Sequence, residues 1–317
     1  NYTLLDRYTF TLTGRVDGSS VLAEGNKYAF FPSAASAWRL ADEPFLSGLN
    51  AVSDLKLRVS YGRTGNSAIG PYQTLGQLTR GWYTFGANAP AVPGYRPGAI
   101  PNPDLKWETT DQYNVGLDFG FFDQRVTGTV DLYRQDTHDL LLTRALPYTS
   151  GFSSVLQNVG ETQNRGIELG LSTVNLEGWH GLDWETDFNV SANRNEIVRL
   201  ADDVPFDVGS GRWVGQPINV NHNYRFEGIW QAEEAAAAAA MGFRPGDIKV
   251  ADLNGDGRIT GDDRTFVGNH YNFPTWQGSL NNRFRFGSLD LSVLATARYG
   301  YMVNSGFVVA YTNLAGR

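Results

Sequence analysis

The residues best suited to chemistry lie in one twelve-residue run, 252–263, with the sequence DLNGDGRITGDD. Calcium prefers oxygen ligands, and a twelve-residue calcium loop supplies them from positions 1, 3, 5, 7, 9 and 12, with glycine at position 6 for the bend. The residues at the ligand positions are Asp252, Asn254, Asp256, Arg258 (through its carbonyl), Thr260 and Asp263, and position 6 is Gly257. The run predicts a Ca²⁺ site; the alternative is a solvated turn rich in Asp, Asn and Gly.

The last ligand position departs from the usual pattern, because Asp263 stands where a glutamate is common. A shorter carboxylate reaches less easily as a bidentate ligand, so the expected affinity is modest. Pro245 precedes the run and 269–274 follow it without a helical pattern. We therefore expect a structural clamp within a long loop, 200–274, and not a calcium switch between two helices.

Other side chains do not make a case for catalysis. The chain has no cysteine, which excludes a disulfide scaffold, a cysteine–zinc site and thiol chemistry. The four histidines, His138, His180, His222 and His270, lack helical metal spacing, and no G-x-S-x-G motif occurs. Two strand carboxylates could serve a glycosidase, but basic residues on the same faces favour simple charge pairing. We expect no enzyme activity.

Composition narrows the class of protein further. The 317 residues include 26 basic and 33 acidic side chains, a net charge of −7 that is spread along the chain, so no nucleic-acid partner is expected. The longest run of small apolar residues, 235–241, is far shorter than the ~20 residues of a spanning helix. Six alanines after Glu233 and Glu234 predict a short surface helix instead.

The elements that must position these residues are strands, because apolar and polar residues alternate in many runs. Alternation places one apolar and one polar face on each strand. The runs lie at 7–16, 55–61, 113–121, 125–132, 167–172, 183–191, 279–286 and 289–293, with a weaker one at 28–39. They reach ~9–16 residues, against ~5–6 for strands of globular proteins and ~9–11 for a strand crossing a bilayer.

Two architectures fit this pattern: a soluble sandwich with an apolar core, and an outer-membrane barrel with an apolar face toward lipid and a polar lumen. Strand length, aromatics at run ends and loop asymmetry favour the barrel. Short turns at 122–124, 175–181 and 287–288 alternate with long polar connections at 17–27, 63–105, 139–161 and 200–274. About nine strands, an odd number, together with a start lacking Met or a signal peptide, predict part of a longer barrel.

Several ordered motifs resemble the barrel of SusC/RagA-type TonB-linked outer-membrane transporters. They are GRVDGSS (14–20), FPSAASAWR (31–39), LKLRVSYGRTGN (55–66), NPDLKWETT (102–110), NVG (158–160), NRGIE (164–168) and PGDIK (245–249) leading into DLNGDG (252–257). The resemblance covers nearly the whole chain. It implies that 1–317 is a partial TonB-dependent receptor barrel domain, all-β and antiparallel, from a barrel of about 22 strands.

The same resemblance implies a function and partners. The family imports oligosaccharides or peptides across the outer membrane of Gram-negative, Bacteroidetes-like bacteria, with a SusD-like surface lipoprotein as lid and TonB as energy source. The plug and the TonB-contacting segment, which would lie N-terminal to this barrel portion, are not in the chain. Residues 200–274 then form an extracellular loop region that contains the calcium-like motif.

Aromatic residues in the long loops are candidates for stacking on a sugar or on a partner protein, because they offer large apolar faces with few rotatable bonds. The chosen residues are Trp82, Tyr83, Tyr95, Trp213, Trp230 and Tyr271; packing within the loops is the alternative for each. A rival for the whole chain is a secreted calcium-binding β-sandwich that recognises glycans or mediates adhesion.

Overall fold

The structure is a computed structural model that describes residues 1–303 except 88, 208–209, 269 and 272, with the backbone alone for 270–271. The chain divides into two compact units. Unit 1 comprises Asn1–Gln216 and Trp276–Ala297, and unit 2 comprises Pro217–Thr275 and Arg298–Arg317. Within the described residues, no helix is long and apolar enough to cross a membrane.

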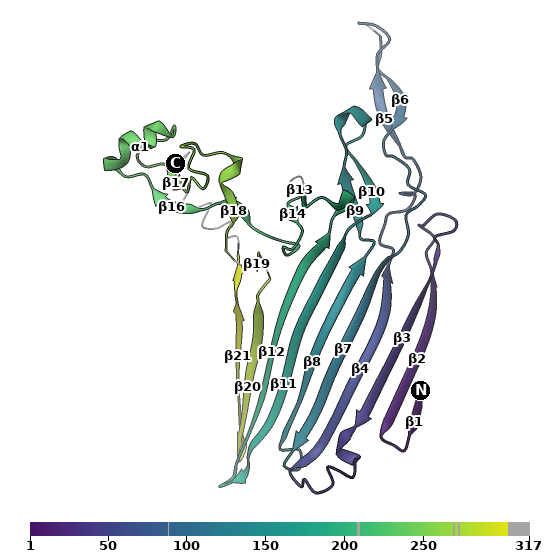
Figure 1. Cartoon of the computed structure of the whole chain (residues 1–317), viewed down its shortest axis with the longest axis vertical. Coiled ribbons are helices and arrows are strands. Elements are labelled where there is room, and N and C mark those ends of the chain that lie inside the picture. The colour runs from purple at the N-terminus through teal and green to yellow at the C-terminus, as the bar shows by residue number, and fades with distance from the viewer. Residues whose placement is uncertain (88, 208–209, 269, 272, 304–317) are drawn as a thin grey trace. The chain divides into compact units, whose positions relative to one another are not determined.

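Unit 1 is built on one ten-stranded sheet that follows the order of the chain (Figure 1). Its strands are β1 (Tyr2–Leu4), β2 (Tyr8–Gly18), β3 (Tyr28–Arg39), β4 (Val52–Asn66), β7 (Glu108–Phe121), β8 (Val126–His138), β11 (Glu161–Trp179), β12 (Leu182–Arg199), β20 (Trp276–Phe286) and β21 (Leu289–Tyr299). Neighbours from β1 to β20 pair antiparallel. The nine predicted strands are confirmed, and β1 is an additional short one.

Tight turns join the strands at one end of the sheet, as the sequence predicts. Phe122, Asp123 and Gln124 all have left-handed φ angles of 55–65° between β7 and β8. Gly287, with φ 58°, turns the chain between β20 and β21. The predicted turn at 175–181 is shorter than expected, because β11 runs to Trp179 and β12 begins at Leu182.

The other end of the sheet carries long connections with small elements of their own. In unit 1 these are β5 (Leu78–Tyr83), β6 (Val92–Pro97), β9 (Leu141–Ala145), β10 (Ser154–Asn158), β13 (Phe206–Asp207), β14 (Arg212–Trp213), η2 (Tyr148–Ser150) and η3 (Ala201–Asp203), with η1 (Leu40–Asp42) at the tight-turn end. Three two-stranded ladders, β5–β6, β9–β10 and β13–β14, stiffen these loops.

Unit 2 consists of short strands and 3-10 turns with one six-residue helix among its described residues. They are β15 (His222–Tyr224), β16 (Phe226–Ile229), η4 (Ala232–Glu234), α1 (Ala235–Ala240), β17 (Ile248–Val250), η5 (Gly261–Asp263), β18 (Arg264–Phe266), β19 (His270–Tyr271) and β22 (Tyr301–Met302). Helix α1 confirms the helix predicted from the alanine run. Gln231 and Glu234 form a capping box ahead of it, which satisfies N–H groups that the helix itself cannot.

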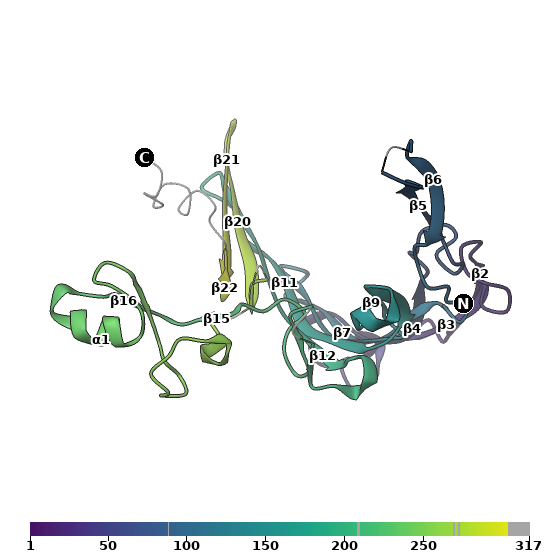
Figure 2. The same ribbon diagram turned by 90° about the horizontal axis from the view of Figure 1, so that it is seen from above.

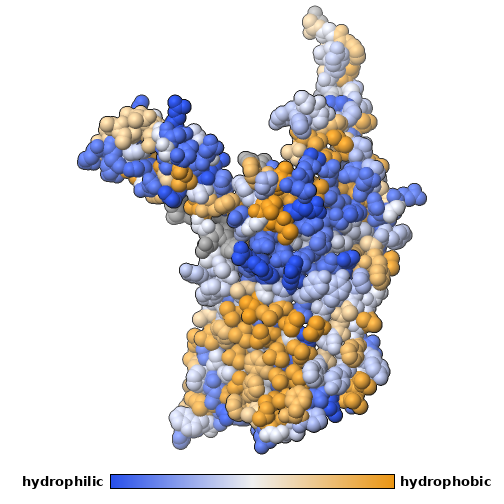
Figure 3. Space-filling view, in the orientation of Figure 1, coloured by the Kyte–Doolittle hydropathy of each residue, from blue (hydrophilic) through white to orange (hydrophobic). Residues whose placement is uncertain are grey.

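Strand register aligns the apolar residues of the ten-stranded sheet on one face. In one row, Val59 lies opposite Val115, followed by Leu132, Ile167 and Ala192 on successive strands. The sheet curves like a segment of a barrel wall (Figure 2), and apolar side chains gather on the lower part of its convex face (Figure 3). Leu132 is 51 % and Ile167 45 % exposed, so within the described part of the chain no second sheet covers this face as a sandwich requires.

Candidate functional site

The concave face of the wall carries charged side chains that pair across strands. The Arg58 guanidinium on β4 donates from Nε to Asp118 on β7 at 3.0 Å and from Nη2 to Asp131 on β8 at 3.1 Å. Lys56 Nζ also lies 2.7 Å from Asp118. The two carboxylates are only about one-fifth exposed (18 % and 22 %). Their charges are therefore matched locally, as the sequence predicts for a polar lumen.

A glycine, Gly116, lies beneath the contact in which Arg58 reaches from β4 across β7 to Asp131 on β8. Gly116 on the middle strand is the register partner of both Arg58 and Asp131. A Cβ at Gly116 would lie 2.5 Å from Asp131 Oδ1 and 2.6 Å from Arg58 Nη2, closer than non-bonded atoms approach. Glycine leaves the space through which the β4 side chain reaches over β7 to β8, and a Cβ here would push the two charged groups away from their present positions.

The same device recurs two strands further on. Tyr133 on β8 is the register partner of Gly166 on β11, which in turn lies opposite Asn193 on β12. Asn193 Nδ2 donates to the Tyr133 hydroxyl at 2.6 Å across the glycine, and a Cβ at Gly166 would lie 2.5 Å from that hydroxyl. We call these two arrangements the glycine bridges.

Ion pairs also join β12 and β20 on the concave face, whereas Arg7 is paired at the tight-turn end of the sheet. Arg283 on β20 contacts Glu185 at 3.0 Å and Asp187 at 3.1 Å on β12. Arg7, which the alternation assigns to the lumen, instead contacts Glu43 at 3.1 Å at the tight-turn end. Tyr8 Oη donates to the same carboxylate at 2.5 Å. These contacts are structural, and they confirm that charge pairing explains the strand carboxylates.

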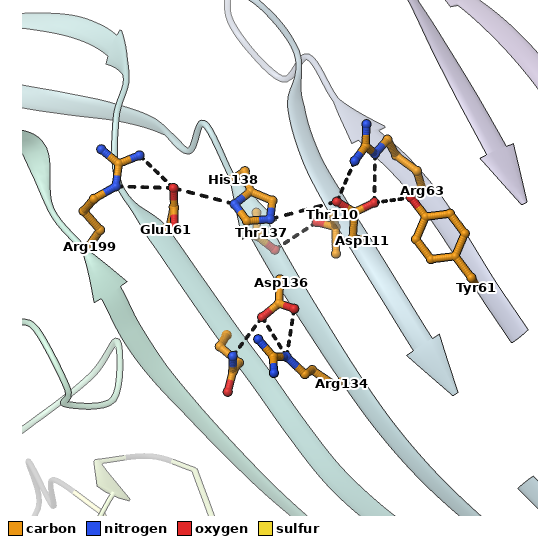
Figure 4. A network of polar contacts seen from close by, with 11 residues as sticks. Tyr61, Arg63, Thr110, Asp111, Arg134, Asp136, Thr137, His138, Glu161 and Arg199 are labelled. Atoms are coloured by element: carbon orange, nitrogen blue, oxygen red, sulfur yellow. Dashed lines mark hydrogen bonds and ion pairs between the residues drawn. The ribbon is translucent and has the colours of Figure 1, made fainter. Parts of the chain in front are cut away.

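A second polar network lies on the opposite, convex face, because its residues share the parity of the apolar rows, and Figure 4 shows its contacts. Asp111 accepts hydrogen bonds from Nε and Nη2 of Arg63, both at 2.8 Å, and from the Tyr61 hydroxyl at 2.7 Å. His138 lies between Asp111, at 3.9 Å, and Glu161, at 3.7 Å, and pairs with them electrostatically only when protonated. A single histidine therefore stands between two carboxylates.

This network was not predicted, because its residues share the strand parity of the apolar residues on the convex face. Arg134 and Asp136 on β8, for example, follow Val130 and Leu132 at even positions. Arg134 Nε donates to Asp136 at 2.8 Å. The sequence does offer one indication of this network: on β8, the residues that follow Leu132 are polar at both odd and even positions. We call the charged residues of this convex region the outer polar band.

The bases of three long connections are joined by residues of the NPDLKW motif. Asn158, at the end of β10, accepts from the Lys106 N–H at 2.8 Å and donates to the carbonyls of Lys106 at 2.8 Å and Asp139 at 2.9 Å. Asn102 Nδ2 donates to the Leu156 carbonyl at 2.8 Å, and the Leu105 side chain is fully buried. We call these contacts the loop clamp.

Close packing at a glycine extends the clamp to a third connection. Trp107 Nε1 donates to the Lys27 carbonyl at 3.1 Å, and its ring meets the edge of Phe31 at 5.5 Å. A Cβ at Gly65 would lie 2.3 Å from the Phe31 ring and 3.0 Å from Trp107. Residues of the NPDLKW motif thus hold the bases of the loops together.

Three of the aromatic candidates lie on the β5–β6 hairpin and are freely accessible. Trp82, Tyr83 and Tyr95 are 65 %, 62 % and 72 % exposed. The Arg80 guanidinium lies 4.5 Å from the Trp82 ring, an arrangement that favours cation–π attraction. Tyr83 meets Phe85 edge-on at 4.8 Å. These rings offer open faces on which a flat apolar surface can stack.

The other three candidates have different surroundings. Trp213 is half-buried in the β13–β14 ladder. Trp230 is only 6 % exposed and packs inside unit 2, with Lys249 Nζ 4.5 Å from its ring, so its ring does not form an open platform. The side chain of Tyr271 lies outside the described residues. Of the six candidates, Trp82, Tyr83 and Tyr95 are therefore the ones that the described residues show exposed on one hairpin, β5–β6.

A cavity that the sequence does not indicate opens beside β9. Its volume is about 430 Å³, and its walls combine apolar and charged side chains from unit 1. Arg144 and Asp202 form an ion pair on its wall, and Arg212 adds a second cation. The lining otherwise comes from Leu142, Thr143, Ala145, Val159, Leu200, Ala201, Val204, Phe206 and Asp207. Such a mixed lining suits a polar ligand with an apolar part.

The run 252–263 folds as a tight loop organised by its own side chains. Asp252 accepts from the N–H groups of Gly255 at 2.7 Å and Gly257 at 2.8 Å, and Asn254 accepts from Asp256 at 2.9 Å. Gly255 and Gly257 have φ angles of 74° and 76°, which glycine alone adopts at little cost. The predicted bend at Gly257 is thus present.

The last acid of the loop closes it. Asp263 is fully buried and accepts from the Leu253 N–H at 2.9 Å and the Thr260 N–H at 2.7 Å. These backbone hydrogen bonds, the one from Thr260 above all, hold the pKa of Asp263 below its usual range. Among the described residues, no three His, Cys, Asp or Glu side chains converge as a metal cluster, so any cation here would also need amide, hydroxyl and carbonyl oxygens.

The geometry of unit 1, with one curved antiparallel sheet, an apolar convex face and charge pairs on the concave face, can now be compared with known proteins. The family model for the TonB dependent receptor-like beta-barrel matches residues 1–315. The chain belongs to this family. Its members are outer-membrane transporters and not enzymes, which confirms the expectation that the chain lacks catalytic activity. The sandwich rival is therefore wrong.

Named relatives agree with this membership. The chain is 36 % identical to TonB-dependent receptor P3 of Formosa agariphila over 99 % of its length and 32 % of the relative. It is 34 % identical to TonB-dependent receptor SusC of Bacteroides thetaiotaomicron over 83 % of its length and 27 % of the relative. The SusC/RagA-type resemblance is thus confirmed. The chain spans about a third of the length of these relatives.

A solved structure shows the same fold. The RagAB peptide importer in the 'open-open' state superposes with a TM-score of 0.79 at 26 % identity, covering 95 % of this chain and 32 % of that one. A second structure, of the RagAB peptide transporter, gives a TM-score of 0.75 at the same identity. The ten-stranded sheet is therefore a portion of a transporter barrel, and it is not closed on itself.

Proposed function

We propose that this chain forms part of the wall and outer loops of an outer-membrane importer of oligosaccharides or peptides. In this proposal the importer works with a SusD-like surface lipoprotein and draws energy from TonB. The apolar convex face contacts lipid, and the concave face, with Arg58, Asp118 and Asp131, borders a water-filled lumen.

The observation that carries the proposal is the opposite polarity of the two faces. Apolar rows such as the one from Val59 to Ala192 are exposed on the convex face, whereas ion pairs cross strands on the concave face. A β-sheet can enter a bilayer only where its backbone hydrogen bonds are satisfied and its outer face is apolar. Similarity to SusC and to the RagAB peptide importer supports the choice of substrates and of a lipoprotein partner.

Uptake in cells tests this proposal. The complete protein should fractionate with outer membranes and need detergent for extraction. Deleting its gene should abolish growth on one class of nutrient, either oligosaccharides or oligopeptides, and loss of TonB should have the same effect. Co-purification of a lipidated surface protein would identify the lid. A protein that is soluble without detergent, or a deletion that leaves growth on both classes unchanged, would contradict the proposal.

We propose further that the exposed rings of the β5–β6 hairpin, Trp82, Tyr83 and Tyr95, contact the substrate or the lipoprotein. Replacing all three by alanine should weaken uptake at low nutrient concentration without changing the amount of protein in the membrane. Alanine at Tyr148, which is 93 % exposed on η2, is the matched control. Equal uptake by both variants would exclude this role.

We also propose that the loop 252–263 binds Ca²⁺ as a structural clamp. The fit rests on its hard oxygen donors and on the carboxylates of Asp252 and Asp263, which the backbone already orients. A bound ion would take oxygens from Asp252, Asn254, Asp256, the Arg258 carbonyl, Thr260 and Asp263, and it would hold the two ends of the loop together.

Calcium titration of the chelated complete protein, followed by isothermal calorimetry, tests the clamp. Asp263→Asn should abolish binding, because it removes a charged ligand at position 12. Asp262→Asn is the matched control, since Asp262 is an exposed neighbour outside the ligand positions. No heat of binding at millimolar calcium, or equal loss in both variants, would remove the claim.

A further inference from the structure

Three arginines form one cross-strand row on the convex face. Arg134 on β8 is the register partner of Arg165 on β11, which is the register partner of Arg194 on β12. Residues directly opposite on adjacent antiparallel strands have Cβ atoms about 4.5–5.5 Å apart. All three side chains are exposed, with 59 % for Arg134 and 61 % for Arg194. We call this set the arginine row.

The arginine row lies at the upper edge of the apolar band. The apolar row that contains Leu132 and Ile167 lies two residues from the arginine row on each strand, on the side of the tight turns. On the neighbouring strands β4 and β7 the arginine row continues as Tyr61 and Tyr113, whose rings are 5.2 Å apart. Tyrosines collect at the boundary between hydrocarbon and headgroups in membrane proteins, so the row marks that boundary.

Two acids lie near the three arginines, so they offset only part of the positive charge of the row. Asp136 accepts from Arg134 through Nε, and Glu196 lies 3.9 Å from Arg194 Nε; both contacts leave the terminal guanidinium nitrogens out. Arg165 forms no ion pair with another residue in the described part of the chain. Like charges placed opposite one another destabilise a sheet, and the row keeps more guanidinium groups than nearby carboxylates, so a bound anion would offset the remaining repulsion.

We propose that the arginine row binds the phosphate groups of lipids in the outer leaflet. Guanidinium groups match phosphate geometry through paired N–H donors, and the row stands at the depth where the headgroups of a bilayer begin. The apolar band below receives the acyl chains of the same lipids. The ligand is therefore a lipid phosphate and not free phosphate, because only a lipid fills both surfaces at once.

This inference rests on the membrane placement proposed above, and a matched pair of lipids tests it. The complete protein, extracted from outer membranes in non-ionic detergent, is titrated with diphosphorylated lipid A and with the same lipid after both phosphates are removed. Native mass spectrometry gives the affinity for each. The unmodified protein should bind the phosphorylated lipid more tightly. Changing all three arginines to glutamine should cost about five-fold per arginine, on the order of 100-fold together, and leave binding of the dephosphorylated lipid unchanged.

Two further variants keep the test decisive. Arg225, Arg244 and Arg264, which are exposed in unit 2, are changed together to glutamine as the charge-matched control, and both affinities should stay as in the unmodified protein. The single variant Arg165→Gln breaks no ion pair within the described residues and should still lose about five-fold if the triple variant does not fold.

The outcomes separate this inference from the proposed function. A membrane-extracted protein that binds both lipids equally, or a triple variant that keeps its preference for the phosphorylated lipid, would overturn the arginine row as a phosphate site alone. Addition of inorganic phosphate should not displace the lipid; displacement would show a site for the free anion instead. A protein that needs no detergent would overturn the membrane placement and this inference together.

Discussion

Asn158 is the centre of the loop clamp, and its replacement by alanine tests whether the clamp holds the outer loops. The side chain makes three hydrogen bonds to two other segments, two with Lys106 and one with the carbonyl of Asp139. Alanine removes all three and leaves the Asp139 carbonyl, which is partly buried, without this donor. The β9–β10 hairpin should then open from its base more often.

The magnitude follows from the exposure of these bonds. A typical intramolecular hydrogen bond contributes about 0.5–1.5 kcal/mol net, and the two bonds with Lys106 are exposed to water, so they belong at the lower end. The three together amount to roughly 2 kcal/mol. Because each 1.4 kcal/mol is a tenfold change in an equilibrium constant, the open state of the hairpin should become about 30-fold more populated.

Amide hydrogen exchange of the complete protein in detergent measures this change directly. The informative amides are those of the β9–β10 ladder, for example Leu142 and Gln157, which are register partners in the hairpin. The Lys106 amide is not informative, since alanine removes its acceptor. Exchange in the ladder should accelerate about 30-fold, while exchange in the paired β7 and β8 stays unchanged.

Two companion variants decide between the clamp and a general loss of stability. Gln157→Ala removes an amide from the next residue, whose side chain donates to no other described residue, and should leave exchange unaltered. Asn158→Asp keeps the acceptor for Lys106 but turns a carboxylate toward two carbonyls, so it should accelerate exchange at least as much as alanine. Unchanged exchange in Asn158→Ala, or equal acceleration in Gln157→Ala, would refute the reasoning.

Three other predictions concern close packing at two glycines and the stability of the 252–263 loop at low pH. Gly116→Ala should break the bridge between Arg58 and Asp131 and lower stability by about 2 kcal/mol, measured as a lower urea midpoint in detergent; an unchanged midpoint contradicts the glycine requirement. Gly65→Ala should cost about 1–3 kcal/mol through collision with the Phe31 ring, seen as faster proteolysis of the loops. Because the folded pKa of Asp263 is depressed, its stabilisation should persist at neutral pH and disappear only as pH falls below its ordinary value of 3.8; exchange of the Thr260 amide measured against pH checks this.

The two-faced wall could be predicted from sequence because a strand has a strict period of two. Every long run with that period became a strand of the sheet, and register then aligned the apolar positions that alternation had separated. The helix at 235–240 could likewise be predicted, since alanine favours helix without tertiary help. These are local properties that each segment carries by itself.

The outer polar band and the loop clamp could not be predicted in the same way. Arg63 and Asp111 lie 48 residues apart and meet only through register, and their parity matches that of apolar neighbours. Asn158 contacts Lys106 across 52 residues. Trp230 could not be distinguished from an exposed loop aromatic, because its burial depends on how unit 2 packs. Pairings at such separations follow from the fold and not from local pattern.

The two glycine bridges share strand β8, and this has a consequence for assembly. Asp131 and Tyr133 lie two residues apart on that strand, one reaching back over Gly116 and the other forward over Gly166. A slip of β8 by one position against its neighbours would turn Asp131 and Tyr133 to the opposite face of the sheet and break both contacts at once. Misaligned strands are thereby penalised at two places simultaneously, so β8 acts as the alignment key while the wall is being put together.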